Sequence, residues 1–324
     1  MASNSSPTKD LLKAAASGDV DSVARLISEG VPVDSVSDEY SGTPVTPLWL
    51  ASMYGRGSIV EYLLSQSAVI DVQKTNGMMP LHVACEEGHL DVVKVLIKNG
   101  AKFDSTAVDW MLMTPLHFAS QRCHLEVARH LISLGADVHA VNRNKATPLH
   151  LASSMNIAEE LLKSGADVNA LDSNNATPLI VACMSATVGV VSCLLDHKSD
   201  IDAVDKFGRT AFLEAARSGN TPVVDLLLTK GVNINQTSKP DNFTALMLAA
   251  QGSHMGTVKI LLKNRIDIEA KTKDGRNVLD VGLEAVKRLE GDQKAHVSEF
   301  LRHMREVKGL KPNSGATKLP AKKK

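Results

Sequence analysis

The phrase TPLH at residues 114–117 returns unchanged at residues 147–150, and close variants stand at residues 46–49 (TPLW), 79–82 (MPLH) and 177–180 (TPLI). The second position of this phrase recurs along most of the chain, at Pro47, Pro80, Pro115, Pro148, Pro178, Ala211, Ala245 and Val278. The steps between these positions are 33, 35, 33, 30, 33, 34 and 33 residues. Such a period is typical of a repeat protein, whose stacked units share one continuous core.

Each repeat predicts two helices separated by a tight turn. In residues 79–108, Pro80 stands in the first turn of a helix, where no backbone N–H is needed, and the residue before it caps that helix. Gly88 ends this short helix, and Gly100 ends the next one as a left-handed cap. Between the glycines, apolar residues recur at helical spacing: Leu90, Val93, Leu96 and Ile97. The unit is therefore a helix, a turn, a second helix and an extended connecting segment, which we call a finger.

The repeated pattern, T-P-L-H-x-A-x-x-x-G-H-x-x-V-V-x-x-L-L-x-x-G-A-x-x-N, resembles the ankyrin repeat over about residues 11–307. The resemblance implies an all-α solenoid of about nine helix-turn-helix units with short extended β-hairpin-like fingers. The first repeat carries Lys13 and Asp21 where a neighbour would otherwise pack, and the last repeat is polar, so we expect both to be caps. The expected organisation is a disordered N-terminus (1–10), an N-terminal cap (11–45), internal repeats (46–276), a degenerate C-terminal cap (277–307) and a disordered lysine-rich tail (308–324).

The composition argues against a nucleic-acid partner and against membrane insertion. The chain has 36 basic and 36 acidic residues, so no net charge attracts it to polyanions, although six lysines follow Val307. It shows neither a signal peptide nor an apolar run of about 18 residues. We expect a soluble monomer in the cytoplasm, with the nucleus as a second location because of the terminal lysines. Four cysteines without CxxC spacing indicate reduced, buried thiols.

Four departures from the period mark candidate functional regions. The finger at 31–45 is long, although surface loops tolerate insertions. The finger before Thr114 ends in the apolar run WMLM at 110–113, which either contacts a partner or folds back onto a neighbouring finger. The repeat from Thr147 lacks three residues, which predicts a notch, a change of curvature or only a tighter turn. The finger at 236–243 gains one residue and a Lys-Pro turn of weak functional content.

The family resemblance implies that partners contact the finger tips and the ends of the first helices, which line a groove. These positions also differ most between repeats. The predicted contact residues are Tyr40, Met53, Tyr54, Met78, Glu86, Glu87, Trp110, Met111, Gln121, Arg122, Arg143, Met184, Phe207, Arg209 and Arg217. The first half of this groove is aromatic and acidic and the second half is basic, which suits a partner of mixed charge. We hypothesise that Tyr54, Trp110 and Met111 form the hot spot.

The sequence offers no catalytic motif, and we expect neither an enzyme nor a cofactor. The histidines of the TPLH phrase and of the helix turns are expected to bind backbone groups, as the family implies. Cys123, His124 and His130 lie close in sequence but lack a second pair at zinc-site spacing, so we expect no metal. Residues 161–169 (LLKSGADVN) are similar to asparaginyl hydroxylase substrates among ankyrin repeats, which makes Asn169 a candidate modification site and Asn235 a weaker one. In the alternative, Asn169 only stabilises its finger.

These features predict a non-catalytic scaffold or adaptor that binds a protein partner through its groove and finger tips. A regulatory inhibitor that covers an enzyme or a transcription factor is the main alternative. A substrate-recognition subunit of a ubiquitin ligase is a further alternative, although we find no convincing recruiting box after Val307. The repeat scaffold alone does not identify the partner.

Overall fold

The computed structural model describes residues 6–37, 44–73, 77–104, 106, 111–185, 187–287, 290–309 and 311. The chain forms two compact units, Met1–Asp167 and Val168–Lys324, which we call unit 1 and unit 2. The described residues contain helices, turns and two isolated β-bridges, Ser37 with Val45 and Thr237 with Thr244. The predicted all-α repeat fold is confirmed.

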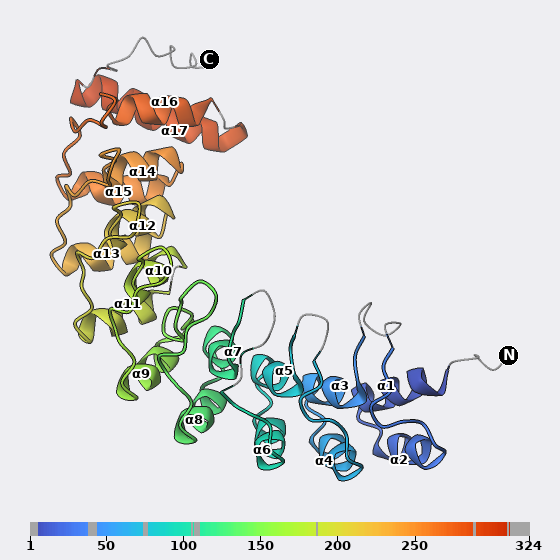
Figure 1. Ribbon diagram of the computed structural model, residues 1–324. Coiled ribbons are helices and arrows are strands. Elements are labelled where there is room, and N and C mark those ends of the chain that lie inside the picture. The colour runs from blue at the N-terminus through green and yellow to red at the C-terminus, as the bar shows by residue number, and fades with distance from the viewer. Residues whose placement is uncertain are drawn as a thin grey trace. The chain divides into compact units, whose positions relative to one another are not determined.

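The described residues of unit 1 form four helix pairs and one single helix (Figure 1). Its helices are α1 (Pro7–Ser17), α2 (Val20–Ser28), α3 (Pro47–Met53), α4 (Gly57–Ser65), α5 (Pro80–Glu87), α6 (Leu90–Lys98), α7 (Pro115–Gln121), α8 (Leu125–Ser133) and α9 (Met155–Lys163). The first helices of the pairs stack in one row, α1 on α3 on α5 on α7. The second helices stack in another row, from α2 to α9.

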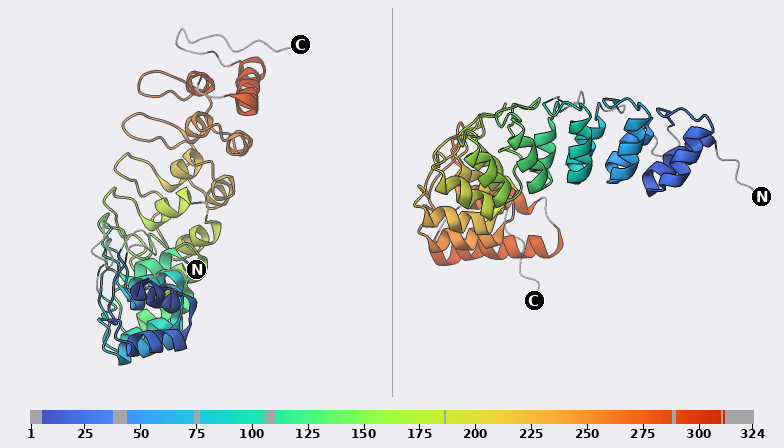
Figure 2. Two further views of the ribbon diagram at one scale, coloured as in Figure 1. Left: turned by 90° about the vertical axis from the view of Figure 1, so that its right-hand side faces the viewer. Right: turned by 90° about the horizontal axis from the view of Figure 1, so that it is seen from below.

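In the part of unit 2 that the structure describes, this arrangement is repeated with four further pairs. Its helices are α10 (Pro178–Met184), α11 (Val188–Asp196), α12 (Ala211–Arg217), α13 (Thr221–Thr229), α14 (Ala245–Gln251), α15 (Met255–Lys263), α16 (Val278–Val286) and α17 (Gly291–Lys308). The first helices α10, α12, α14 and α16 stack in sequence, and α11, α13 and α15 form the second row. In the left view of Figure 2 the fingers of unit 2 project to one side of its helices.

The TPLH phrase and its variants begin helices α3, α5, α7 and α10, and the phrase also joins a repeat to the next one. The Thr46 hydroxyl accepts the backbone N–H of Trp49 at 3.2 Å, which caps α3. In the next-but-one repeat, Nδ1 of the buried His117 accepts the N–H of Thr114 at 3.2 Å, while Nε2 donates to the carbonyl of Ala146 at 3.0 Å. This imidazole therefore connects a helix start to the following finger, and the structural role expected of these histidines is confirmed.

The core consists almost entirely of small and aliphatic side chains. Between the two rows of helices in unit 1, Leu50, Leu63, Val93 and Leu131 are at most 1% exposed. Because close-packed burial of this kind supplies about 25 cal/mol per Å² of apolar surface, the stacked rows hold each unit together. None of the helices in the described part of the chain has both the length and the apolar composition that crossing a lipid bilayer requires.

The short repeat from Thr147 has lost its first helix. Its first residues form a turn with i to i+3 hydrogen bonds, from Leu151 N–H to the Pro148 carbonyl (3.2 Å) and from Ala152 N–H to the Leu149 carbonyl (3.3 Å). Three missing residues leave too little chain for an α-helical turn before α9 starts at Met155. The described residues therefore contain eight helix pairs and a single helix, where about nine pairs were expected.

Two local expectations are wrong. Helix α1 begins at Pro7, inside the segment expected to be disordered, because the Ser6 hydroxyl accepts the N–H of Lys9 at 3.3 Å and Pro7 fits the first helical turn. The thiol of Cys123 is exposed, although all four cysteines were expected to be buried. Cys123 occupies the turn position that glycine holds in other repeats, with φ of 64°, and this turn lies at the surface.

Candidate partner-binding surfaces

Several of the predicted contact residues of unit 1 lie at the ends of its first helices, and some of these are accessible. Tyr54 follows α3 and is 41% exposed, and Glu87 and Gln121 at the ends of α5 and α7 are exposed. Met53 is half-buried. Arg122 donates to the carboxylate of Glu86 at 2.6 Å, a hydrogen bond that raises the pKa of Arg122. These two side chains bind each other across neighbouring repeats, so Glu86 is not a free acid.

Met78 was predicted at a finger tip, but it is buried. It is 8% exposed, and its carbonyl accepts the indole N–H of Trp49 at 3.1 Å. Met78 lies just before the cap of α5 and contacts the preceding repeat, so its burial removes it from the contact surface. Comparing the repeats did not predict this hydrogen bond, because only one repeat has a tryptophan, Trp49, at the histidine position of the TPLH phrase.

Two members of the predicted contact set, Tyr40 and Trp110, lie outside the described residues. The hot-spot hypothesis is therefore described structurally only at Tyr54 and Met111. The half-buried Met111 accepts the backbone N–H of Arg143 at 2.8 Å through its carbonyl. This contact joins two fingers and leaves the Arg143 side chain exposed.

In unit 2 a cavity of about 790 Å³ opens between three successive fingers and the ends of two first helices. We call it the unit 2 groove. Its lining residues are Phe207, Arg209, Arg217, Ser238, Lys239, Pro240, Asp241, Phe243, Leu248, Gln251, Lys273, Asp274 and Arg276. Phe207, Arg209 and Arg217 were all predicted as contact residues, and the structure brings them together here. Met184, the remaining predicted residue of unit 2, is 48% exposed at the end of α10 and does not line the groove.

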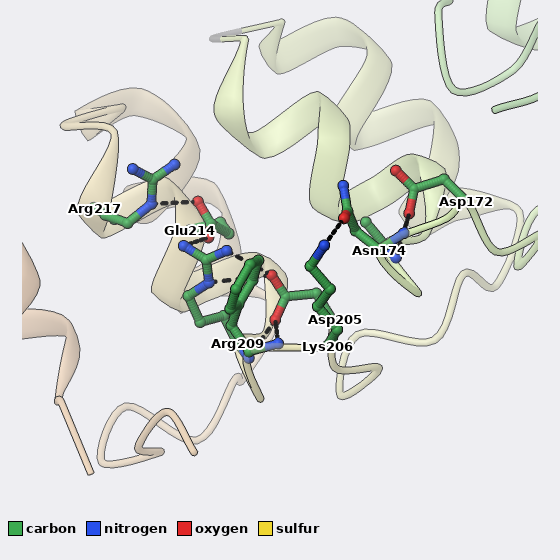
Figure 3. A network of polar contacts seen from close by, with 9 residues as sticks. Asp172, Asn174, Asp205, Lys206, Arg209, Glu214 and Arg217 are labelled. Atoms are coloured by element: carbon green, nitrogen blue, oxygen red, sulfur yellow. Dashed lines mark hydrogen bonds and ion pairs between the residues drawn. The ribbon is translucent and has the colours of Figure 1, made fainter. Parts of the chain in front are cut away.

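A buried acid organises the arginines of this groove (Figure 3). The Glu214 side chain is 1% exposed, and its two oxygens lie 2.6 Å from Nη1 of Arg209 and 2.7 Å from Nε of Arg217. Arg209 also donates to Asp205 at 2.8 Å and 3.1 Å. One carboxylate therefore fixes two guanidinium groups at the mouth of the groove.

Glu214 is the residue that our sequence reasoning missed. It occupies the fourth position of its first helix, and at the equivalent position every other repeat after the first has an apolar residue: Leu50, Val83, Phe118, Leu151, Val181, Leu248 and Val281. An ionised carboxylate is costly to bury unless it is paired, so an acid at this position is a strong departure from the repeat. Aligning the repeats position by position along the helix, rather than only at helix ends and fingers, would have revealed it.

Aromatic rings lie among the cations of the groove. Phe207 is 48% exposed, with the Arg209 guanidinium 4.4 Å and the Lys206 ammonium 5.0 Å from its ring centroid. In the third finger, Arg276 lies 5.9 Å from the centroid of the Phe243 ring. Cations over aromatic faces attract the rings electrostatically, which restricts both partners. The groove therefore presents apolar surface beside positive charge.

The candidate modification site Asn169 has a structural contact in unit 2. Its side-chain oxygen accepts the backbone N–H of Asp200 at 2.8 Å, which joins two successive fingers. Asn235 makes the same contact with the N–H of Asp267 at 2.9 Å. The finger-stabilising role is therefore present, and modification of Asn169 stays a prediction.

The described residues contain no group of three or more His, Cys, Asp or Glu side chains placed to hold a metal ion. Burial raises the pKa of the Cys85 and Cys183 thiols, which disfavours the reactive thiolate form.

Comparisons with known proteins agree with this architecture. A family model described as "Ankyrin repeats (3 copies)" matches residues 11–107, 107–172 and 149–238, and one described as "Ankyrin repeat" matches residues 241–273. The crystal structure of the human ASB11 ankyrin repeat domain is similar with a TM-score of 0.61 and 28% identity, covering 68% of this chain and 97% of that chain.

Curated relatives match over shorter stretches. The transient receptor potential cation channel subfamily A member 1 homolog of Caenorhabditis elegans is 32% identical over 97 residues, which are 30% of this chain and 8% of that protein. NF-kappa-B inhibitor alpha of Gallus gallus is 41% identical over 54 residues, 17% of each chain. The chain thus spans only a small part of the length of these relatives. Since the family models cover more than half of its residues, this chain belongs to the ankyrin repeat family.

Proposed function

We propose that this protein is a non-catalytic scaffold or adaptor that binds a protein partner, with the unit 2 groove as one of its contact surfaces. The ankyrin repeat is a protein-interaction fold, so partner binding is the expected activity of the stacked repeats. The proposal depends on one observation: side chains that differ between repeats lie together around one groove. Phe207, Arg209 and Arg217 contribute little to the repeat core, yet all three line one groove.

The half-exposed Phe207 is the anchor that we assign to this surface. An aromatic side chain that becomes buried at the centre of an interface contributes about 2 kcal/mol or more when it is a true hot spot. Phe207 is held between Lys206 and Arg209 before any partner arrives, so little conformational entropy is lost on binding. Its ring lies in a finger rather than in the core, so it can be removed without unfolding the repeat.

A regulatory inhibitor is the second candidate, and the similarity to NF-kappa-B inhibitor alpha supports it. An inhibitor covers one partner, whereas an adaptor holds two at once. Light scattering of the purified complex measures this stoichiometry directly. A ternary complex supports the adaptor, and a binary complex that resists a further partner supports the inhibitor.

The proposal is tested by affinity capture with the full chain as bait, followed by titration of the captured protein against bait variants. Phe207→Ala should weaken binding at least tenfold, as expected for a hot spot. Val204→Ala is the matched control, because Val204 is 52% exposed in the same finger but does not line the groove. Failure of the full chain to retain any protein above an empty resin contradicts partner binding. Equal affinities of the Phe207→Ala and Val204→Ala variants contradict the placement of the contact in this groove.

A further inference from the structure

The unit 2 groove crosses three repeats in register. Arg209, Phe243 and Arg276 occupy the same position of successive fingers, one residue before the helix cap. Packed helices lie about 8–10 Å apart, so three fingers span roughly 20 Å, which an extended chain crosses in about six residues. The groove therefore has the dimensions of a short extended peptide segment.

The acids around the groove are mostly bound to its own cations. Glu214 and Asp205 bind Arg209, and Arg276 lies 2.6 Å from Asp274 and 2.8 Å from Glu284. These contacts neutralise the two arginines at the edges of the groove. They also leave the groove with fewer free acids than its composition suggests.

Several cations have unused capacity. Only Nε of Arg217 is bound to Glu214, and Figure 3 shows its two terminal nitrogens pointing away from that carboxylate. The exposed ammonium groups of Lys239 and Lys273 have no ion-pair partner among the residues that the structure describes. Asp241 is the one lining acid without such a partner in the same described part of the chain. The unpaired charge that lines the groove is therefore predominantly positive.

Arg217 is prepared for a carboxylate. A guanidinium binds a carboxylate with two parallel N–H donors, and the edge formed by the terminal nitrogens of Arg217 is available for this. Its bond to the buried Glu214 fixes the direction of that edge before a ligand arrives. Phosphate sites in proteins more often gather several free arginines. Here Arg209 and Arg276 are already bound to two acids each, which favours a carboxylate over a phosphate.

We propose that the unit 2 groove binds an extended acidic segment of a partner protein, about six residues long, in which acidic and apolar side chains alternate. One carboxylate binds Arg217 and another lies near Lys273, while an apolar side chain packs on Phe207. Alternation follows because successive side chains of an extended chain point to opposite sides. This inference rests on the proposed partner-binding function and specifies the chemistry of the partner.

The experiment measures fluorescence anisotropy of labelled octapeptides with the full chain at 50 mM salt. The first peptide alternates Glu or Asp with Leu or Phe, the second replaces the acids by Gln or Asn, and the third carries phosphoserine in place of one Gln. We expect the acidic peptide to bind best and to weaken as salt rises to 500 mM. The double variant Arg217→Gln/Lys273→Gln should bind it roughly three- to tenfold more weakly, the range for exposed charge pairs.

Lys271→Gln is the matched control, because Lys271 is exposed two residues from Lys273 but does not line the groove. Preference for the neutral peptide, or equal losses in Lys271→Gln and the double variant, overturns the inference. Tighter binding of the phosphoserine peptide than of the acidic one also overturns it, because the occupant is then a phosphopeptide. A captured protein partner that binds the double variant and the unchanged chain equally refutes the acidic segment but leaves the proposed function intact. Absence of any captured protein refutes the proposed function itself.

Discussion

Replacing Glu214 by leucine should leave the fold at least as stable as it is now. The other repeats after the first place an apolar side chain at this position, and Leu50 and Leu248 there are 1% and 7% exposed. Exchanging a buried ion pair for packed apolar residues is often neutral or stabilises by about 1–4 kcal/mol. After Glu214→Leu, Arg209 keeps its bonds to Asp205, and Arg217 is already 40% exposed to water. We expect the free energy of unfolding to rise by about 0–2 kcal/mol, because full burial of a leucine contributes about 1.5–3 kcal/mol and the two lost ion pairs offset part of it.

The opposite change should have the opposite sign. In the double variant Arg209→Met/Arg217→Met, the carboxylate of Glu214 stays buried without a cation, which costs about 3–5 kcal/mol. Arg276→Met is the matched control, because its partners Asp274 and Glu284 are about half exposed and such pairs contribute about 0–1 kcal/mol.

Urea denaturation followed by circular dichroism measures the free energy of unfolding of the three variants. Urea is uncharged, so it does not screen the ion pairs, whereas guanidinium chloride would screen them. The dependence of each free energy on urea concentration must stay constant across the variants, because repeat arrays can lose two-state cooperativity. The reasoning is refuted if Glu214→Leu lowers the free energy of unfolding by more than about 1 kcal/mol. It is also refuted if the double arginine variant is no less stable than Arg276→Met.

Three further predictions concern other parts of the chain. Burial lowers the pKa of His117 to about 4, against about 6.5 in an unfolded chain, so between these pH values the unfolded state binds one more proton than the folded state. The free energy of unfolding should therefore fall by about 3 kcal/mol from pH 7 to pH 4. Urea titrations at the two pH values should show that this pH-dependent component is absent from the His117→Met variant. Gly208 has φ of 64°, and a Cβ there would lie 2.6 Å from the backbone nitrogen of Lys239. Gly208→Ala should therefore lower the free energy of unfolding by about 1 kcal/mol or more. It should also weaken partner binding, which calorimetric titration would measure. Asn169→Ala leaves the N–H of Asp200 without its acceptor and should lower the free energy of unfolding by about 1 kcal/mol. Mass spectrometry of protein from a hydroxylase-containing cell should find one added oxygen on Asn169. If all of the protein carries unmodified Asn169, the modification is contradicted.

The fold was predictable because its determinants are local and repeated. A threonine cap followed by proline, as at Thr46 and Pro47, starts a helix in every repeat that has it except the shortened one from Thr147, and the apolar positions that follow recur in most repeats. The loss of the first helix after Thr147 was only partly predictable. Three missing residues could be counted in the sequence, but their effect depends on whether the remaining turn can still hydrogen-bond, which the structure shows it does.

The contact surface was less predictable, because it depends on which side chains meet across repeats. Glu86 and Arg122 are 36 positions apart and both looked like free charges in the sequence, yet they bind each other. Met78 looked like a finger-tip residue and is covered. Such outcomes depend on the stacking distance between repeats and on the reach of individual side chains. The repeat length read from the sequence gives neither quantity.

Glu214 shows how a repeat protein can separate folding from recognition. An apolar residue at its position is sufficient for packing, as Leu248 demonstrates in the next repeat, so stability alone gives no reason for an acid there. The same carboxylate binds two of the three arginines that line the groove, Arg209 and Arg217, and fixes the direction in which Arg217 presents its free edge. If Glu214→Leu proves as stable as the unchanged chain, its ion pairs contribute no net stability, and their remaining effect is the arrangement of charge at the groove. A loss of discrimination between acidic and neutral peptides in that stable variant would then assign the buried acid to recognition.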